Sequence, residues 1–177
     1  MRRHAESWRL VAPRNRESWI EAAFDRPNPR LDGGRIGYRA QVADLTLEVA
    51  QKLLAAQPFS ALLGARVTAF GDGGATLELD IRPDLQQQNG FLHGGVLSYA
   101  ADNALTFAGG TALGPDVLTG GFTISYLRPA QGTMLRAEAK VAYASRRQAT
   151  CTCELTTLDD AGTSTLCAIA QGTIIAR

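Results

Sequence analysis

Apolar and polar residues alternate along much of the C-terminal two thirds of the chain. Between residues 77 and 81, and again between residues 135 and 141, every second side chain is apolar, which is the period of a strand with one covered and one solvated face. Residues 71–74 read Gly-Asp-Gly-Gly and separate the first run from an apolar stretch that ends at Phe70, so this pair predicts a β-hairpin. Later strands are expected over residues 118–127, 134–143, 148–158 and 164–175.

A helical period precedes the hairpin. Leu45, Val49 and Leu53 recur four residues apart, which places them on one face of a helix. Asp44 is the candidate for its N-terminal cap, and Pro58 lies beyond its end. We therefore expect a docked amphipathic helix in front of the first strand.

Residues 94–113 form a second helical segment of different character. They are apolar on nearly every face and rich in alanine and other small residues, which is typical of a buried helix. The elements then follow as a helix, two strands, a long loop, a buried helix and four strands. This order predicts an α+β fold in which the buried helix lies on one face of an antiparallel sheet.

Residues 1–40 are read as an Arg/Pro-rich N-terminal extension to a domain that spans residues 41–177. The extension holds nine arginines against five acidic residues, and its prolines and glycines interrupt any long element. A short helix is expected over residues 18–24. Trp8 and Trp19 predict that the extension docks on the domain.

Overall composition excludes several function classes. The 177 residues suit one domain, and 45% hydrophobic with 20% charged residues is the composition of a globular protein. The net charge of +1 gives no field to gather nucleic acid or an anionic membrane. No run reaches the roughly 20 apolar residues of a membrane helix, and no secretory signal precedes the domain, so a cytoplasmic protein is expected.

The three cysteines suggest free thiols in a reducing compartment. Their number is odd and their spacing fits no disulfide framework. Cys151 and Cys153 would share one face of a strand, which is too few ligands for zinc, so no metal is expected. We read both as small buried residues.

Candidate chemistry lies at the start of the buried helix. Gly94 and Gly95 open it with backbone N–H groups that have no partner inside the helix, and the helix dipole adds to their attraction for negative charge. A carbonyl under nucleophilic attack needs such donors. Asp102 follows Gly94 by eight residues, which is about 12 Å along the axis, so the two could act on one substrate only if they come from two subunits.

The same residues could also serve the fold and not a reaction. His93 could cap or pack, and the two glycines could serve a tight turn. An aspartate in an apolar helix is costly unless it is paired or used, and a paired, structural aspartate is the commoner case. The spacing of the His-Gly-Gly turn and Asp102 together is what favours a functional site.

The pattern around this turn resembles the hotdog-fold thioesterases of the phenylacetate-degradation type. Their motif, an amide residue, a glycine, His-Gly-Gly and an acidic residue, falls with every spacing kept on Gln87, Gly90, residues 93–95 and Asp102. Thr119, followed by residues 122–130, is similar to the strand that brings a hydroxyl to the family's site and ends in a Pro-Ala turn. The resemblance covers roughly the last two thirds of the chain, from residue 58 onward, and matches nothing in residues 1–40. It implies a curved sheet wrapped around a central helix.

The resemblance also implies the activity and the role of each residue. Gly94 N–H would polarise the carbonyl of an acyl-CoA thioester, and Asp102 of the facing subunit would act as general base or as nucleophile, a choice that the sequence leaves open. Gln87 and Thr119 would orient water or substrate, and His93 would brace the turn. No cofactor is implied, since coenzyme A arrives with the substrate, and the implied assembly is a homodimer that pairs into a homotetramer.

Further residues are expected to bind the substrate rather than to react with it. Coenzyme A carries phosphates, so arginines should meet it. The acyl group should follow apolar surface beside the helix near Leu105 and Phe107. The expected substrate-binding set is Gly95, Asn89, Arg128, Arg146, Arg147 and Tyr99.

Two other functions remain open. A non-catalytic acyl-CoA sensor would use the same pocket, although retention of the acidic residue argues against it. A hotdog dehydratase acting on enoyl or hydroxyacyl thioesters would need a catalytic histidine paired with an acid from another element, and the only histidines are His4 and His93.

Overall fold

The computed structural model describes residues 45–177. The expected N-terminal extension lies outside the described residues, together with its helix over residues 18–24 and the docking of Trp8 and Trp19. Asp44 also lies outside them, and the expectation that it caps the first helix is wrong, because Thr46 is the N-cap of that helix.

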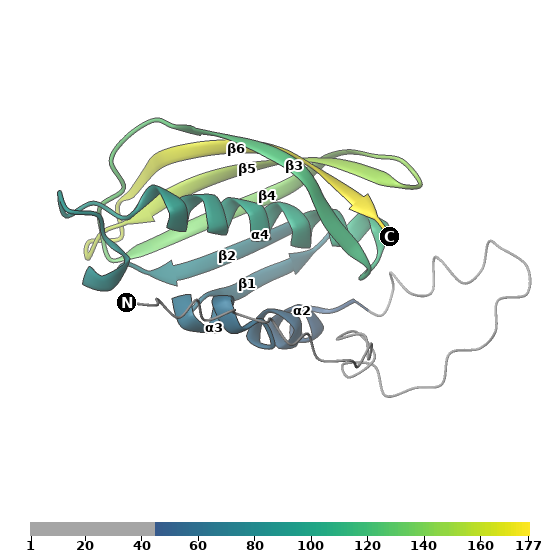
Figure 1. Ribbon diagram of the computed structural model, residues 1–177, viewed down its shortest axis with the longest axis horizontal. Helices are drawn as coiled ribbons and strands as arrows, with labels where there is room; N and C mark the ends of the chain where they lie inside the picture. Colours follow the sequence, from purple (N-terminus) through teal and green to yellow (C-terminus); the bar gives the residue numbers. More distant parts are fainter. Residues whose placement is uncertain (1–44) are drawn as a thin grey trace, which may run out of the picture.

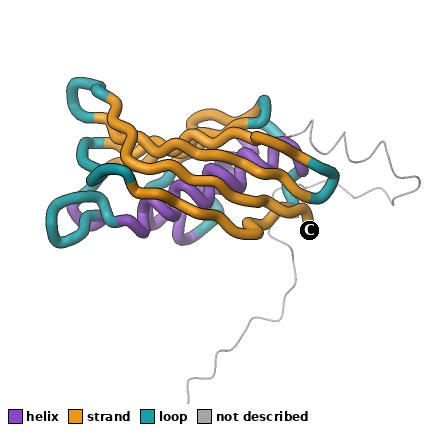
Figure 2. The backbone as a smooth tube through the Cα atoms, turned by 90° about the horizontal axis from the view of Figure 1, so that it is seen from above, coloured by secondary structure: helices purple, strands orange, loops and turns teal. Residues whose placement is uncertain are grey.

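The described chain is one antiparallel sheet with a long helix against one face, as the α+β prediction requires (Figures 1 and 2). The sheet order is β1-β2-β4-β5-β6-β3, so β1 and β3 are its two edges. The hydrophobic core lies between helix α4 and the concave face of the sheet. The bounds are β1 (Arg66–Gly71), β2 (Gly74–Asp80), β3 (Val117–Tyr126), β4 (Met134–Ala144), β5 (Gln148–Leu158), β6 (Ser164–Ala176) and α4 (Gly94–Leu113).

The predicted hairpin and the alternating strands are confirmed. β1 and β2 are joined by a turn in which Asp72 and Gly73 both have positive φ, the conformation that a tight hairpin needs. In β4 the alternate residues Leu135, Ala137 and Ala139 are buried beneath α4, while the residues between them are half-buried or exposed. Cys151 and Cys153 are buried on the same face of β5, as expected.

Helix α4 is buried because its surface is almost entirely apolar. Its 20 residues span about 30 Å, enough to cross the whole sheet. Small side chains let the strands approach it closely, and Gly109 is the extreme case, since a Cβ there would lie 2.7 Å from the Cβ of Ile174 on β6. The fully buried residues of its core face include Ala100, Ala101, Ala104, Leu105 and Ala108.

Two short helices precede the sheet, where one was expected. Helix α2 (Leu47–Ala55) packs against β1 and begins after Thr46, whose hydroxyl accepts a hydrogen bond from Val49 N–H. Pro58 does not simply follow a helix end. It is the first residue of α3 (Pro58–Leu63), because proline has no N–H to lose there and its φ already suits a helix. A 3-10 turn, η1 (Pro83–Leu85), leads into the loop before α4.

No helix in the described part is long and apolar enough to cross a membrane.

Candidate active site

The N-terminus of α4 presents one free backbone donor. His93 is the N-cap, with extended backbone angles, and its imidazole Nδ1 accepts a hydrogen bond from Gly95 N–H at 2.9 Å. The expectation that both glycine N–H groups are unpaired is therefore wrong for Gly95, because the histidine side chain folds back over the first turn. Gly94 N–H has no partner among residues 45–177.

A cavity of about 380 Å³ adjoins Gly94. Gln87, Gly94 and Arg128, three of the residues singled out from the sequence, line it together with Tyr126. The Gln87 side-chain oxygen accepts a hydrogen bond from Asn89 N–H at 2.9 Å, so the amide is held in the loop and its NH₂ group remains as a donor. Asn89 thus contributes its backbone to the site, and its side chain is exposed.

Tyr126 is a site residue that the sequence analysis missed. Its hydroxyl donates to the carbonyl oxygen of Gly94 at 3.0 Å and lies 2.7 Å from the Ser98 hydroxyl, which then acts as the donor to Tyr126. This ties the end of β3 to the first turn of α4. The sequence signal was weak, since an aromatic residue at a strand end is usually packing.

The second half of the site lies around Asp102, in the middle of α4. Thr119 of β3 donates its hydroxyl hydrogen to Asp102 Oδ1 at 2.7 Å. Thr106 Oγ1 lies 2.7 Å from Thr119 Oγ1, and because the single hydrogen of Thr119 is already used, Thr106 is the donor in this pair. A chain of hydroxyls thus orients the half-buried carboxylate, and Thr106, four residues after Asp102 on the same helix face, was not predicted.

The two halves do not meet within one chain. Gly94 and Asp102 are separated by about 12 Å along the helix axis, as expected. They are attached to opposite ends of one strand, because Tyr126 contacts Gly94 and Thr119 contacts Asp102. That strand, β3, is hydrogen-bonded to β6 on one side and forms the sheet edge on the other.

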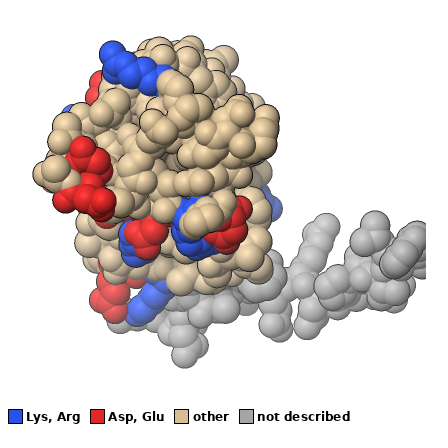
Figure 3. Space-filling view, turned by 90° about the vertical axis from the view of Figure 1, so that its left-hand side faces the viewer, with Lys and Arg blue, Asp and Glu red and all other residues tan. Residues whose placement is uncertain are grey.

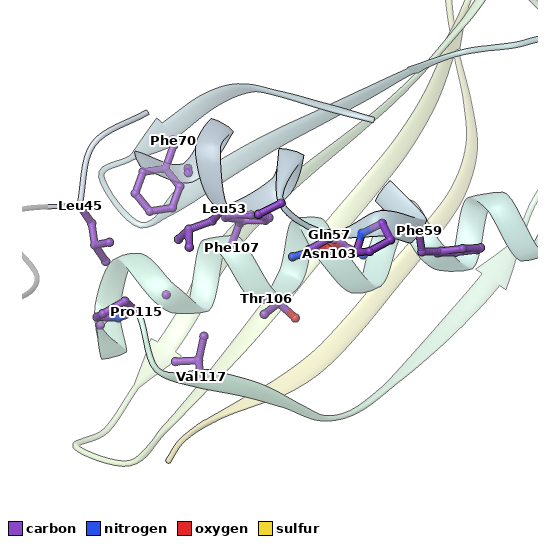
Figure 4. Close-up of a pocket in the computed structure, with 15 residues that line it drawn as sticks. Leu45, Leu53, Gln57, Phe59, Phe70, Asn103, Thr106, Phe107, Pro115 and Val117 are labelled. Carbon is purple, nitrogen blue, oxygen red and sulfur yellow. The ribbon is translucent and has the colours of Figure 1, made fainter. Parts of the chain in front are cut away.

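An apolar cavity of about 550 Å³ lies between α2 and α4 (Figure 4). Phe107, expected beside the acyl group, lines it. Leu105 points into the core instead and has no exposed surface. Tyr99 lies next to the cavity, where its ring stands edge-on to that of Phe59 at 5.4 Å.

The three expected arginines differ in their positions. Arg128 lines the cavity beside Gly94 and donates from its guanidinium to Leu166 O at 3.1 Å. Arg146 and Arg147 are exposed in the turn between β4 and β5 and line neither of the two cavities.

Charges do not collect into one large patch at the end of the molecule seen in Figure 3. Basic and acidic groups adjoin one another in the lower half of that view, and most of its upper half carries neither. Ion pairs such as Arg66 with Asp80 and Arg82 with Asp84 hold opposite charges side by side on the surface. Among residues 45–177 no cluster of three His, Cys, Asp or Glu side chains could hold a metal.

Comparisons with known proteins agree with the resemblance. The model of the thioesterase superfamily matches residues 89–164, which include Gly94, Asp102 and Thr119. A thioesterase family protein from Silicibacter pomeroyi has a similar structure, with a TM-score of 0.67, 30% identity and coverage of 79% of this chain and 98% of that one. A variant of the phenylacetic acid degradation protein PaaI from Thermus thermophilus gives a TM-score of 0.59 and 30% identity, covering 68% of this chain and 100% of that one.

A sequence relative supports the same class. A candidate esterase of Mycobacterium tuberculosis is 31% identical over 96 residues, which are 51% of this chain and 69% of that protein. The expected hotdog architecture and the resemblance to thioesterases of the phenylacetate-degradation type are confirmed by these matches.

Proposed function

The chain belongs to the thioesterase superfamily, which assigns it to thioester hydrolysis, and on this premise we propose that it hydrolyses acyl-CoA thioesters to a free acid and coenzyme A. The observation that carries the proposal is the Asp102 carboxylate, half-buried and oriented by the Thr119 hydroxyl, in a chain that also offers a free Gly94 N–H at a helix N-terminus.

We propose that the site is completed by a second copy of the chain. If two copies of β3 pair in antiparallel fashion about a two-fold axis at Thr123, with Gly120 and Gly121 of the β-bulge sharing one position of the ladder, Tyr126 of one copy lies opposite Thr119 of the other. The Gly94 donor tied to that tyrosine then faces the Asp102 carboxylate tied to that threonine. Support comes from the position of β3 at the sheet edge, where its backbone groups are available for pairing. Pairing of two such dimers into a tetramer remains a further expectation.

In the proposed reaction the thioester carbonyl oxygen accepts a hydrogen bond from Gly94 N–H, which stabilises the negative charge that develops there. Asp102 takes a proton from water, the water oxygen forms a bond to the carbonyl carbon, and the carbon–sulfur bond breaks to release the coenzyme A thiolate. Alternatively, Asp102 attacks directly and water then hydrolyses the resulting anhydride. Gln87 orients the substrate through its free NH₂ group, and His93 braces the turn through its bond to Gly95.

Coenzyme A would lie on the Gly94 side of the site. Arg128 is the first candidate for its phosphates, because it lines the cavity beside that donor. Arg146 and Arg147 are the alternatives, since both are exposed. The substrate brings its own coenzyme A, so the proposed reaction uses no further cofactor. We propose that the protein acts in the cytoplasm.

The direct test is thiol release from acyl-CoA substrates by the wild-type protein and by Asp102→Asn. We expect the variant to lose nearly all turnover while its oligomeric state, measured by light scattering, stays unchanged. Asp116→Asn is the matched control, because Asp116 is exposed beyond the end of α4. Binding of acyl-CoA without any thiol release by the wild type would favour the sensor hypothesis instead.

Mixing two inactive variants tests the composite site. Gly94→Pro removes the free N–H and suits the fold, because proline is favoured at the first helical position and His93 already has the extended backbone (φ −64°, ψ 134°) that precedes proline. Each variant alone should be inactive. Refolded together with Asp102→Asn, half of the dimers are mixed and each has one intact site, so about a quarter of wild-type activity should return. No recovery in verified mixed dimers would contradict a site shared between subunits.

A further inference from the structure

We propose that the apolar cavity between α2 and α4 holds the acyl chain of a straight-chain aliphatic thioester of medium length, and that the depth of this cavity sets the chain-length preference. The inference rests on the proposed acyl-CoA hydrolysis and names the class of acyl group for that same site.

The cavity lining has the chemistry of a hydrocarbon site. Its volume is about 550 Å³, and no Lys, Arg, His, Asp or Glu of the described chain is among its lining residues. All three of its polar residues have a hydrogen-bond partner within the protein: Gln57 Oε1 accepts from Ser60, Asn103 Nδ2 donates to Tyr99 O, and the Thr106 hydroxyl donates to Thr119. A charged acyl end would lose its water there without gaining a partner of opposite charge.

One end of the cavity adjoins the candidate reactive carboxylate. Thr106 lines the cavity and is hydrogen-bonded to the Thr119 hydroxyl, which in turn holds Asp102. Asn103, the residue after Asp102, lines the cavity as well. A thioester carbonyl beside Asp102 can therefore place its acyl chain directly in this space.

The other end lies beyond Phe107, where Leu45 and Pro115 are seen in Figure 4. From Asn103 to Gly114, both of which line the cavity, the helix advances by eleven residues or about 16 Å. An extended chain covers roughly 3.5 Å in three bonds, so this length corresponds to roughly fourteen bonds. An acyl group of about eight to twelve carbons therefore fits within the cavity.

A single aromatic ring would fill the same space poorly. An apolar cavity of about 150 Å³ already accommodates benzene, so one ring would leave most of the 550 Å³ without contacts. Each further buried methylene, by contrast, can improve binding by up to about fourfold. We expect kcat/KM to rise with chain length up to about twelve carbons and then to level off or fall.

Gly110 allows the depth of the cavity to be changed. It lines the cavity, and a Cβ there would meet only Val117 Cγ2, at an ordinary 3.9 Å, so the first added carbon fits. Replacing glycine inside a helix also raises helix propensity. We expect Gly110→Leu to shorten the preferred chain by about three carbons, the number that leucine adds beyond Cβ, and Gly110→Ala to have a smaller effect.

The test is the kcat/KM profile from butyryl- to palmitoyl-CoA, with phenylacetyl-CoA included, for the wild type, both Gly110 variants and the control Ala112→Leu. Ala112 lies on the same helix and does not line the cavity. A shortened optimum in Gly110→Leu alone supports the proposal. An unchanged optimum in that variant, or a wild-type preference for phenylacetyl-CoA, overturns it.

Binding of decanoate separates this proposal from the catalytic one. Titration calorimetry with decanoate needs no turnover. If the wild type cleaves no acyl-CoA but binds decanoate, and Gly110→Leu weakens that binding at least tenfold, the proposed function fails and the cavity assignment stands. If Asp102→Asn abolishes turnover but decanoate binds equally well to wild type and Gly110→Leu, the catalytic proposal stands and the cavity assignment fails.

Discussion

Removing the Thr119 hydroxyl tests how strongly the catalytic rate depends on one hydrogen bond to Asp102. Thr119→Val keeps the shape of the side chain and removes both the 2.7 Å hydrogen bond to Asp102 and the acceptor for Thr106. A hydrogen bond to a charged group contributes about 1.5–3 kcal/mol, which corresponds to a loss of about 10- to 150-fold in kcat/KM. Because the contact orients the carboxylate and not the acyl chain, we expect the loss in kcat, with KM little changed.

The measurement is thiol release from a medium-chain acyl-CoA. Thr119→Ser retains the hydroxyl and should stay within a fewfold of wild type. Thr152→Val makes the same change on an exposed residue of β5, away from the β3 edge, and should have no effect. Wild-type kcat in Thr119→Val, or an equal loss in Thr119→Ser, would refute the role given to this hydroxyl.

Three further predictions concern stability and are checked by urea denaturation. Gly109→Ala should lower the free energy of unfolding by about 1–3 kcal/mol, although alanine favours helices more than glycine does, because the added Cβ would lie 2.7 Å from Ile174. An unchanged free energy of unfolding would mean that α4 can move away from β6. Thr46→Ala should cost about 1 kcal/mol through loss of the α2 N-cap, and no loss would show that the cap bond is not used in solution. Burial raises the pKa of Cys151 to about 11, so the unfolded state loses its thiol proton at a lower pH than the folded state. The free energy of unfolding should therefore fall as pH rises from about 8.5 to about 11. Cys151→Ala should show a shallower fall, and the same slope in both proteins would contradict this prediction.

Local patterns were enough to predict most of the elements. The residues of α4 were predicted at the bounds observed, because an apolar run with glycines at both ends has few other ways to hide its surface. The strands were found from their alternation, which depends only on one face being covered. Helix α3 was missed, since its six residues carry no helical period and proline was taken as an end and not as a beginning.

Only part of the site was predicted, because only some of its residues stand out from their neighbours in the sequence. Gly94 and Asp102 stand out locally, one as a helix start and the other as a carboxylate among apolar residues. Tyr126 and Thr106 gave no such signal, because their importance arises from what they touch and not from their neighbours in the chain. His93 was expected to cap the helix or brace the turn, but its partner Gly95 N–H was not predicted, because this pairing depends on the side-chain conformation of the histidine.

The sequence by itself determined most of the helices and strands, where a helix N-terminus offers a backbone donor, and that this donor lies too far along the helix from Asp102 to share a substrate within one chain. These properties follow from short-range geometry, which a few adjacent residues specify. Only the tertiary structure decided that β3 is an edge strand, that Thr119 holds Asp102 while Tyr126 holds the start of α4, and that an apolar cavity lies beside the carboxylate. Each of these joins elements far apart in the chain, so it depends on how the sheet curves around the helix.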